Sequence, residues 1–186
     1  MNLKKYVRSA AIAVGLTLAA CSNPQRVPIQ PVPNVSLPRF VGDWYVIACI
    51  PTFIETEAYN AIESYRLKSD GSIATTFTFN QGSLSGPRKS YHPTGYVAAD
   101  SGNAVWGMQF IWPFKSEYII AYLDPEYRMT IIARNARDYV WYMARTPTLS
   151  DADYQAALQR IAAMQYPVQK IRKVEHGATE IPAAAH

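Results

Sequence analysis

The sequence predicts an all-β fold: eight antiparallel strands, joined up and down by short hairpins, close into a barrel with a C-terminal α-helix packed on its outside. Three observations lead to this prediction. Short β-rich runs recur about every ten to fifteen residues between Gly42 and Arg145, separated by turn-forming residues. Large apolar side chains alternate with small or polar ones along these runs, and one helical pattern follows them. Closure into a barrel is favoured because it leaves no strand edge exposed.

The N-terminus has the pattern of an export signal. Three cationic residues precede an apolar run over 10–20, which is too short to cross a bilayer as a helix. The run ends in Leu18-Ala19-Ala20-Cys21, which resembles a lipobox. We therefore expect residues 1–20 to be a lipoprotein signal peptide and Cys21 to be the lipid-attachment site that anchors the chain in a membrane. An ordinary signal peptide followed by a cysteine is the alternative.

The residues after the cysteine suggest a location and a tether. Ser22, rather than Asp, resembles the sorting pattern of outer-membrane lipoproteins and predicts a domain that is lipid-anchored at the cell outer membrane and faces the periplasm. Residues 21–38 contain five prolines and almost no charge, which predicts an extended, semi-rigid tether without helix or central strand. The barrel and its helix are then expected over 39–175, followed by a disordered tail over 176–186.

Composition limits the choice of partners. After removal of the leader, the 186-residue chain is still long enough for one domain with a substantial core. Its formal net charge of +4 falls to about +1 without the three leader cations, and no basic run exceeds two residues. We therefore expect no nucleic-acid partner. A homodimer is left open.

Eight strands are expected from the turn signals, with the alternation indicating an apolar interior. Ala104, Trp106, Met108, Phe110 and Trp112 share one face of their strand. Alternation does not say whether the interior is filled or hollow. The expected strands are 43–51, 59–68, 72–80, 89–99, 103–111, 116–123, 127–134 and 138–145, with a short ninth strand within 168–174.

A helix is expected over 151–164. Ser150 is suited to be its N-cap, and two aspartates lie in its first turn, where the helix dipole favours negative charge. Tyr154, Leu158 and Ile161 lie on one stripe, so this face should pack against the outside of the barrel.

Three motifs in order resemble those of the lipocalin family. Gly42-Asp43-Trp44-Tyr45 resembles the motif that opens the first lipocalin strand. Leu123-Asp124-Pro125-Glu126-Tyr127-Arg128 resembles the second motif, and the stretch that ends in Arg145-Thr146-Pro147 resembles the third. The span 38–174 is similar to the bacterial outer-membrane lipocalins and their relative apolipoprotein D.

The resemblance implies an eight-stranded lipocalin barrel whose signature residues hold the fold. Trp44 should close one end, with Arg145 stacked on its ring and bonded to nearby carbonyls. Gly42 permits the tight entry into the first strand. Asp124 and Tyr127 belong to the second motif and are likewise structural.

The resemblance also implies a binding protein and no enzyme: a membrane-anchored lipocalin that takes a fatty acid or lysophospholipid for lipid transport, storage or envelope maintenance. A lipoprotein with a filled barrel and a protein partner is the alternative. A lipid-modifying enzyme that uses Cys49 is less favoured. The sequence has no nucleophile motif, no glycine-rich phosphate loop and no histidine spacing for a metal, so no cofactor or metal is expected.

Strand phase predicts which side chains would contact the ligand. Glu63 is the exception among them, because a carboxylate in an apolar cavity is costly unless it is neutralised or bonded. A bulge could move it outside, or tyrosines could satisfy it. Otherwise Glu63 contacts the head group of the ligand and sets the head-group preference. Its ionised form would disfavour a fatty-acid carboxylate. The expected contacts are Glu63, Tyr65, Phe77, Trp106, Met108, Phe110, Trp112, Tyr118 and Tyr122.

The same alternation places Cys49 and the mouth of the barrel. Counted from an inward Trp44, Val46 and Ala48 point inward and Cys49 points outward. Cys49 without a disulfide partner would be a buried small hydrophobe or, alternatively, a reactive thiol. The open end is then expected to carry Phe53, Ile54, Trp112 and Phe114, interleaved with Arg88, Lys115 and Arg137.

Overall fold

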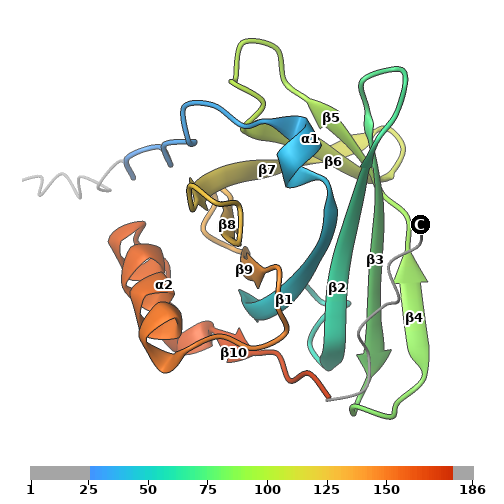
Figure 1. Ribbon diagram of the computed structural model, residues 1–186, viewed down its shortest axis with the longest axis vertical. Coiled ribbons are helices and arrows are strands. Elements are labelled where there is room, and N and C mark those ends of the chain that lie inside the picture. The colour runs from blue at the N-terminus through green and yellow to red at the C-terminus, as the bar shows by residue number, and fades with distance from the viewer. Residues whose placement is uncertain (1–25, 178–186) are drawn as a thin grey trace, which may run out of the picture.

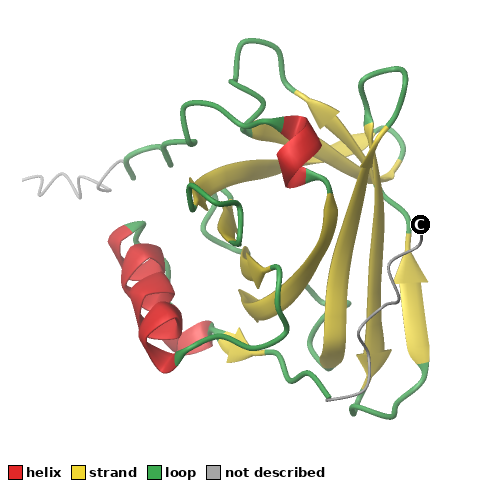
Figure 2. Ribbon diagram, viewed as in Figure 1, coloured by secondary structure: helices red, strands yellow, loops and turns green. Residues whose placement is uncertain are grey.

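One antiparallel sheet closes on itself to form the body of the molecule (Figures 1 and 2). The computed structural model describes residues 26–177. Pairing runs from β1 through β9, and β9 returns to β1, which confirms the predicted eight-stranded up-and-down barrel. The strands are β1 (Gly42–Ile50), β2 (Ala58–Leu67), β3 (Ile73–Gln81), β4 (Arg88–Tyr91), β5 (Thr94–Val97), β6 (Val105–Ile111), β7 (Phe114–Leu123), β8 (Met129–Ala133) and β9 (Val140–Ala144).

The fourth barrel strand is broken, whereas the sequence predicted one strand over 89–99. β4 and β5 both pair with β3, and His92 and Pro93 separate them. Pro93 has no N–H to donate to a ladder, although its carbonyl accepts a bond of 3.1 Å from the Thr75 N–H. β4 and β5 together therefore count as one of the eight strands.

β-Bulges in two strands overturn three side-chain orientations that the sequence predicted. The β1–β9 register shifts between Val46 and Ala48, so Ala48 packs outside the barrel and Cys49 joins the interior cluster. The β7–β8 register shifts between Ile120 and Tyr122, which places Tyr122 outside as well. Each bulge adds one residue, and one extra residue reverses the face of every side chain that follows.

The helix α2 (Asp151–Ala163) packs on the outside of the barrel, as predicted (Figure 1). The Ser150 hydroxyl caps it by accepting the Asp153 N–H at 3.1 Å. Ala157 and Ile161 are its buried residues, and the cluster beneath them contains Tyr45, Ile47 and Ile119. After the 3-10 turn η1 (Val168–Lys170), β10 (Arg172–Lys173) pairs with β1, a shorter ninth strand than expected.

The proline-rich segment is packed on the barrel, where the sequence predicted an extended, semi-rigid tether. We call residues 26–36 the strap. Its Val32 N–H donates to the Ile120 carbonyl of β7 at 2.9 Å, and its Ile29 and Val35 are buried. Gly102 makes the close approach possible, because a Cβ there would lie 2.1 Å from the Pro33 carbonyl oxygen.

A short helix follows the strap, in a stretch that the sequence predicted to be extended. The helix α1 (Leu37–Phe40) has Pro38 in its first turn, where a missing N–H costs nothing. Its Phe40 is fully buried and packs on Trp44 with ring centroids 5.2 Å apart. The folded domain therefore begins before residue 39. Cys21 and residues 1–20 lie outside the described residues.

The Arg145 guanidinium closes the end of the barrel at which β1 starts. It lies 3.8 Å above the centroid of the Trp44 ring. It also donates to the carbonyls of Asp43 (2.6 Å), Phe40 (2.8 Å), Arg39 (2.9 Å) and Val41 (3.1 Å). Burial lowers the pKa of Arg145 to about 10, so the guanidinium stays charged at neutral pH. One side chain thus holds α1 and the entry to β1 in place.

The second motif shapes the neighbouring β7–β8 turn. Asp124 is buried and accepts the backbone N–H groups of Arg128 and Met129, the latter at 2.7 Å. The Tyr127 hydroxyl accepts the Ser36 N–H at 2.9 Å, which ties the end of the strap to this turn. Both residues hold backbone at the closed end and are far from the barrel mouth.

The chain end differs from the expected disordered tail at its first two residues. His176 Nε2 lies 2.9 Å from the Val46 carbonyl oxygen, and the Gly177 N–H donates to Asn60 Oδ1 at 2.8 Å. Residues 176 and 177 are thus fixed on the barrel. The rest of the expected tail lies outside the described residues.

We expect Arg145→Met to lower the free energy of unfolding by about 3 kcal/mol, because several carbonyls, three of them in part-buried hydrogen bonds, lose their donor and Trp44 loses its cation. Urea titration followed by circular dichroism measures the change. Arg128→Met is the matched control at the same end, since Arg128 is exposed and its ion pairs are screened by water. Equal losses in the two variants would contradict a closing role for Arg145.

Candidate functional site: the barrel cavity

The barrel encloses a cavity of about 510 Å³ that opens at the end opposite Trp44. Strands from all around the barrel contribute to its wall, and most of the lining side chains are apolar or aromatic. The volume falls within the range of small-molecule sites, which is roughly 300–1,000 Å³. The apolar lining includes Ile54, Tyr65, Phe77, Tyr91, Met108, Phe110, Ile111, Tyr118, Ile132, Tyr139, Trp141 and Met143.

Stacked aromatic rings form the floor of the cavity. Trp106 stacks on Tyr118 with centroids 4.9 Å apart and an interplanar angle of 9°, and Phe40 meets Trp106 edge-on at 5.5 Å. The Tyr65 and Tyr118 hydroxyls lie 2.8 Å apart in a buried hydrogen bond. Only one of these hydroxyls donates to the other, so the pair keeps one hydrogen to offer elsewhere.

Glu63 faces this cavity from the middle of β2. It stands between Trp44 of β1 and Phe77 of β3 in the sheet register. Its Oε2 is buried without a hydrogen-bond partner. Burial, with a smaller contribution from the nearby Glu55, raises the pKa of Glu63 well above the ordinary value. The protein therefore favours a neutral carboxyl here, which can donate a hydrogen bond as well as accept one.

Glu55 is a second carboxylate in the cavity wall, but it is fully engaged. It lies in the β1–β2 loop and accepts the indole N–H of Trp141 at 2.8 Å. Its other oxygen accepts the Thr52 hydroxyl at 2.6 Å and the Thr52 backbone N–H at 2.9 Å. Glu55 thus shapes the loop at the mouth.

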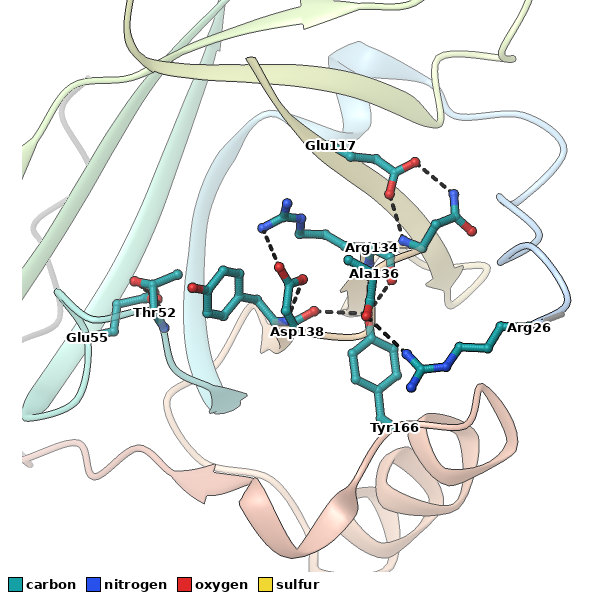
Figure 3. Close-up of polar contacts among 10 residues, drawn as sticks. Arg26, Thr52, Glu55, Glu117, Arg134, Ala136, Asp138 and Tyr166 are labelled. Carbon is teal, nitrogen blue, oxygen red and sulfur yellow. Dashed lines mark hydrogen bonds and ion pairs between the residues drawn. The ribbon is translucent and has the colours of Figure 1, made fainter. Parts of the chain in front are cut away.

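Beside the β1–β2 loop, a polar cluster surrounds the β8–β9 loop at the mouth (Figure 3). Glu117 of β7 accepts the backbone N–H of Asn135 at 2.6 Å and its side-chain amide at 2.7 Å. Arg134 pairs with Asp138 at 3.2 Å, but its Nε is buried without a partner. Glu63 Oε2 and Arg134 Nε are therefore two unpaired polar atoms on residues that line one cavity.

The structure separates the expected ligand contacts into two groups. Six of the nine line the cavity: Glu63, Tyr65, Phe77, Met108, Phe110 and Tyr118. Three do not, and those expectations are corrected. Trp106 lies in the buried core behind Tyr118, and Trp112 is 82% exposed at the β6–β7 turn beyond the strand. Tyr122 lies outside under Arg160, because of the bulge in β7.

Sequence analysis missed the part of the wall that β8 and β9 contribute. Ile132, Trp141 and Met143 line the cavity, as do Arg134 and Glu55. Alternation within Val140–Ala144 would have placed Trp141 and Met143 on one face. No sequence signal marks Glu55 or Arg134, since loop geometry brings them to the mouth.

Cys49 faces the barrel interior but is not one of the residues that line the cavity. It is 2% exposed within the interior cluster, and burial raises the pKa of its thiol. A thiol that is held protonated and away from the cavity is a poor nucleophile. In the described part of the chain, no three His, Cys, Asp or Glu residues gather in a way that could hold a metal ion. Residues 26–177 also contain no helix long and apolar enough to cross a membrane.

Barrel and cavity together define the class of the protein: a small closed β-barrel with a hollow, largely apolar interior. Comparison with known proteins identifies the family. Residues 35–176 match the lipocalin-like domain, which covers most of the chain. The chain therefore belongs to the lipocalin family, whose members are binding proteins rather than enzymes.

Relatives extend along nearly the whole chain. The outer membrane lipoprotein Blc of Citrobacter freundii is 30% identical over 166 residues, which cover 87% of this chain and 92% of that protein. Temperature-induced lipocalin-1 of Arabidopsis thaliana is 25% identical and covers 81% and 84%. Among solved structures, insecticyanin of the tobacco hornworm Manduca sexta superposes with a TM-score of 0.62 at 14% identity, covering 81% and 85%. This last likeness concerns the fold alone.

We expect Glu63→Gln to stabilise the fold increasingly as the pH rises. The folded state holds the Glu63 proton above the ordinary pKa of glutamate, so the wild type loses stability between that pKa and the raised one. Glutamine cannot ionise, and the difference should reach roughly 1–3 kcal/mol, the cost of a buried unsatisfied polar group. Urea titrations over a pH series measure it. Glu57→Gln, at an exposed position, should show no such trend.

Proposed function

We propose that this chain is a lipid-anchored lipocalin of the outer membrane that faces the periplasm and carries a fatty acid or a lysophospholipid. The observation that supports this most directly is the open apolar cavity of about 510 Å³. A cavity of this size argues against the alternative of a filled barrel with a purely structural role. The lipobox-like Cys21 and the outer membrane lipoproteins among the relatives support the anchor and the location. The biological role would then be lipid transport, lipid storage or maintenance of the cell envelope.

The two unpaired polar atoms suggest how an amphiphilic ligand is oriented. The acyl chain would lie against Phe77, Met108 and Met143, while oxygen atoms of the ligand would reach Glu63 or Arg134. A neutral Glu63 donates to an ester or carboxylate oxygen, so it disfavours a fatty acid only when it is ionised. Arg134 Nε offers a charged donor to a carboxylate or phosphate.

Native mass spectrometry of the chain from Ser22 onward, with organic extraction of bound molecules, tests the proposal. A co-purifying fatty acid or lysophospholipid supports it. An empty protein whose tryptophan fluorescence does not respond to either lipid class would refute it and would direct attention to protein partners.

A bulky substitution inside the cavity should block the ligand. Met143→Trp places a larger ring where Met143 lines the wall, and we expect the affinity for a fluorescent fatty acid to fall at least about tenfold, equivalent to about 1.4 kcal/mol. Fluorescence polarisation measures the affinity. Met129→Trp makes the same exchange outside the barrel, next to Tyr142, and should bind normally. Circular dichroism verifies that both variants fold. Unchanged binding by Met143→Trp would place the ligand elsewhere.

The ionisation of Glu63 should make fatty-acid binding pH-dependent. As the pH rises through the raised pKa, Glu63 becomes charged and repels the fatty-acid carboxylate, so the affinity of the wild type should fall towards alkaline pH. Glu63→Gln should remove this decline and shift the preference between fatty acid and lysophosphatidylcholine. Parallel titrations with the two lipids measure both effects. Identical pH profiles for the variant and the wild type would count against a role for Glu63 in ligand recognition.

A further inference from the structure

The strap fixes where the N-terminal part of the chain leaves the barrel. Its first described residue, Arg26, donates to the Ala136 carbonyl at 3.2 Å, in the loop between β8 and β9 (Figure 3). The Ile29 N–H donates to Asn135 Oδ1 in the same loop at 2.8 Å, and Val35 is bonded to Gly102 at the closed end. The strap therefore runs from the open end to the closed end. The chain that precedes Arg26 therefore joins the strap at the open end of the barrel.

The chain length limits the distance between the proposed anchor and the mouth. Cys21 stands five residues before Arg26. An extended residue spans about 3.4 Å, so the chain allows Cys21 to be at most about 17 Å from the Arg26 backbone. If Cys21 carries acyl chains, the bilayer that holds them lies on the side of the molecule where the cavity opens.

The rim of the mouth carries the four most exposed large apolar side chains of the described residues. We call Phe53, Phe110, Ile111, Trp112 and Phe114 the mouth crest. Phe53 is 87% exposed, Trp112 82%, Phe114 75% and Ile111 72%. Phe53, Phe110 and Ile111 also line the cavity, and Ile111 pairs with Phe114 across the β6–β7 turn. Four of these side chains belong to the β6–β7 hairpin, and Phe53 lies on the β1–β2 loop at the same open end. Exposed apolar groups gathered at one end of a barrel mark an interaction surface, and aromatic side chains are favoured at the membrane–water interface.

The charges around the mouth crest suit a phospholipid surface. Arg26, Lys89 and Lys115 are exposed on open-end segments. Of the nearby carboxylates, Glu55 and Glu117 are held in hydrogen bonds below the rim, while Glu57 is exposed. Cations beside aromatic groups favour contact with a membrane that contains some anionic lipid.

We propose that the mouth crest docks into the interface of the same bilayer that holds the acylated Cys21, so that the cavity opens directly onto lipid. The strap sets this orientation by bringing the anchor out beside the mouth. An amphiphile would then pass between bilayer and barrel without crossing water. The inference rests on the proposed lipid anchor but does not depend on which ligand the cavity holds.

Depth-dependent quenching of tryptophan tests the docking. The full chain is reconstituted into vesicles of phosphatidylethanolamine with a minor share of phosphatidylglycerol and of a phospholipid spin-labelled near its headgroup. Comparison with Trp112→Phe isolates the signal of Trp112 from that of the other three tryptophans. The matched control, Trp112→Phe/Leu67→Trp, moves the reporter to Leu67, which is 41% exposed at the closed end of β2.

Docking predicts that Trp112 is quenched several-fold more strongly than a tryptophan at position 67. Phe53→Ser/Ile111→Ser/Phe114→Ser should weaken that quenching without lowering the melting temperature, because these side chains are exposed. Equal quenching at both positions would overturn the proposal. So would quenching confined to Trp141, which lines the cavity and would then report only a bound lipid.

Self-association and loss of the anchor each give a distinct result. Protection of Trp112 from aqueous iodide that is lost when the protein is diluted in the bilayer would mean that a second copy covers the mouth crest, which also overturns docking. Flotation with the vesicles separates the anchor from the docking: if Cys21→Ser floats as well as the wild type, the anchor and this inference both fail. Ligand binding in solution would be unaffected by that result.

Discussion

The stacking of Arg145 on Trp44 at the closed end supports the rest of the architecture. The guanidinium holds the carbonyls of α1 and of the entry to β1, and this places Phe40 beneath Trp106 and Trp44. That aromatic layer is the floor on which Tyr65 and Tyr118 rest. Because one end is filled by rings and a charge in fixed geometry, the remaining interior can stay hollow without the barrel collapsing. The cavity is thus a consequence of how the closed end is built.

The hollow interior also explains the state of Glu63. A filled apolar core would have to exclude a carboxyl, whereas a cavity with water or ligand access can retain one at the cost of a raised pKa. Glu55, Glu117 and Asp138 lie nearer the mouth and are each matched by hydrogen bonds or an ion pair. These carboxylates are therefore satisfied near the rim, whereas Glu63 in the interior keeps an oxygen without a partner. This difference is typical of a site prepared for an oxygen-bearing ligand.

The sequence predicted the closed barrel, its eight strands and the outer helix because these depend on alternation, turn residues and capping. It also placed six cavity residues on the inner face. It failed where one extra residue enters a strand: the bulges in β1 and β7 turned Cys49 inward and Tyr122 outward. No local sequence pattern predicts a bulge, because a bulge is a property of two paired strands. The prediction that the proline-rich segment is an extended tether failed for a related reason. They correctly excluded a central strand, but a segment without strand pairing can still pack by single hydrogen bonds and buried side chains.

The packed strap limits how the barrel can be oriented relative to a membrane that holds its N-terminal segment. A free proline-rich tether would let the barrel stand at any orientation to its membrane, with the mouth facing solvent as often as lipid. A strap bonded at both ends of the barrel removes that freedom and leaves only four residues between Cys21 and Arg26. The apolar mouth crest would be a liability on a protein that presents it to water. Beside a short anchor it becomes a surface held close to the lipid that solvates it best, and the barrel gains a defined direction for loading and release.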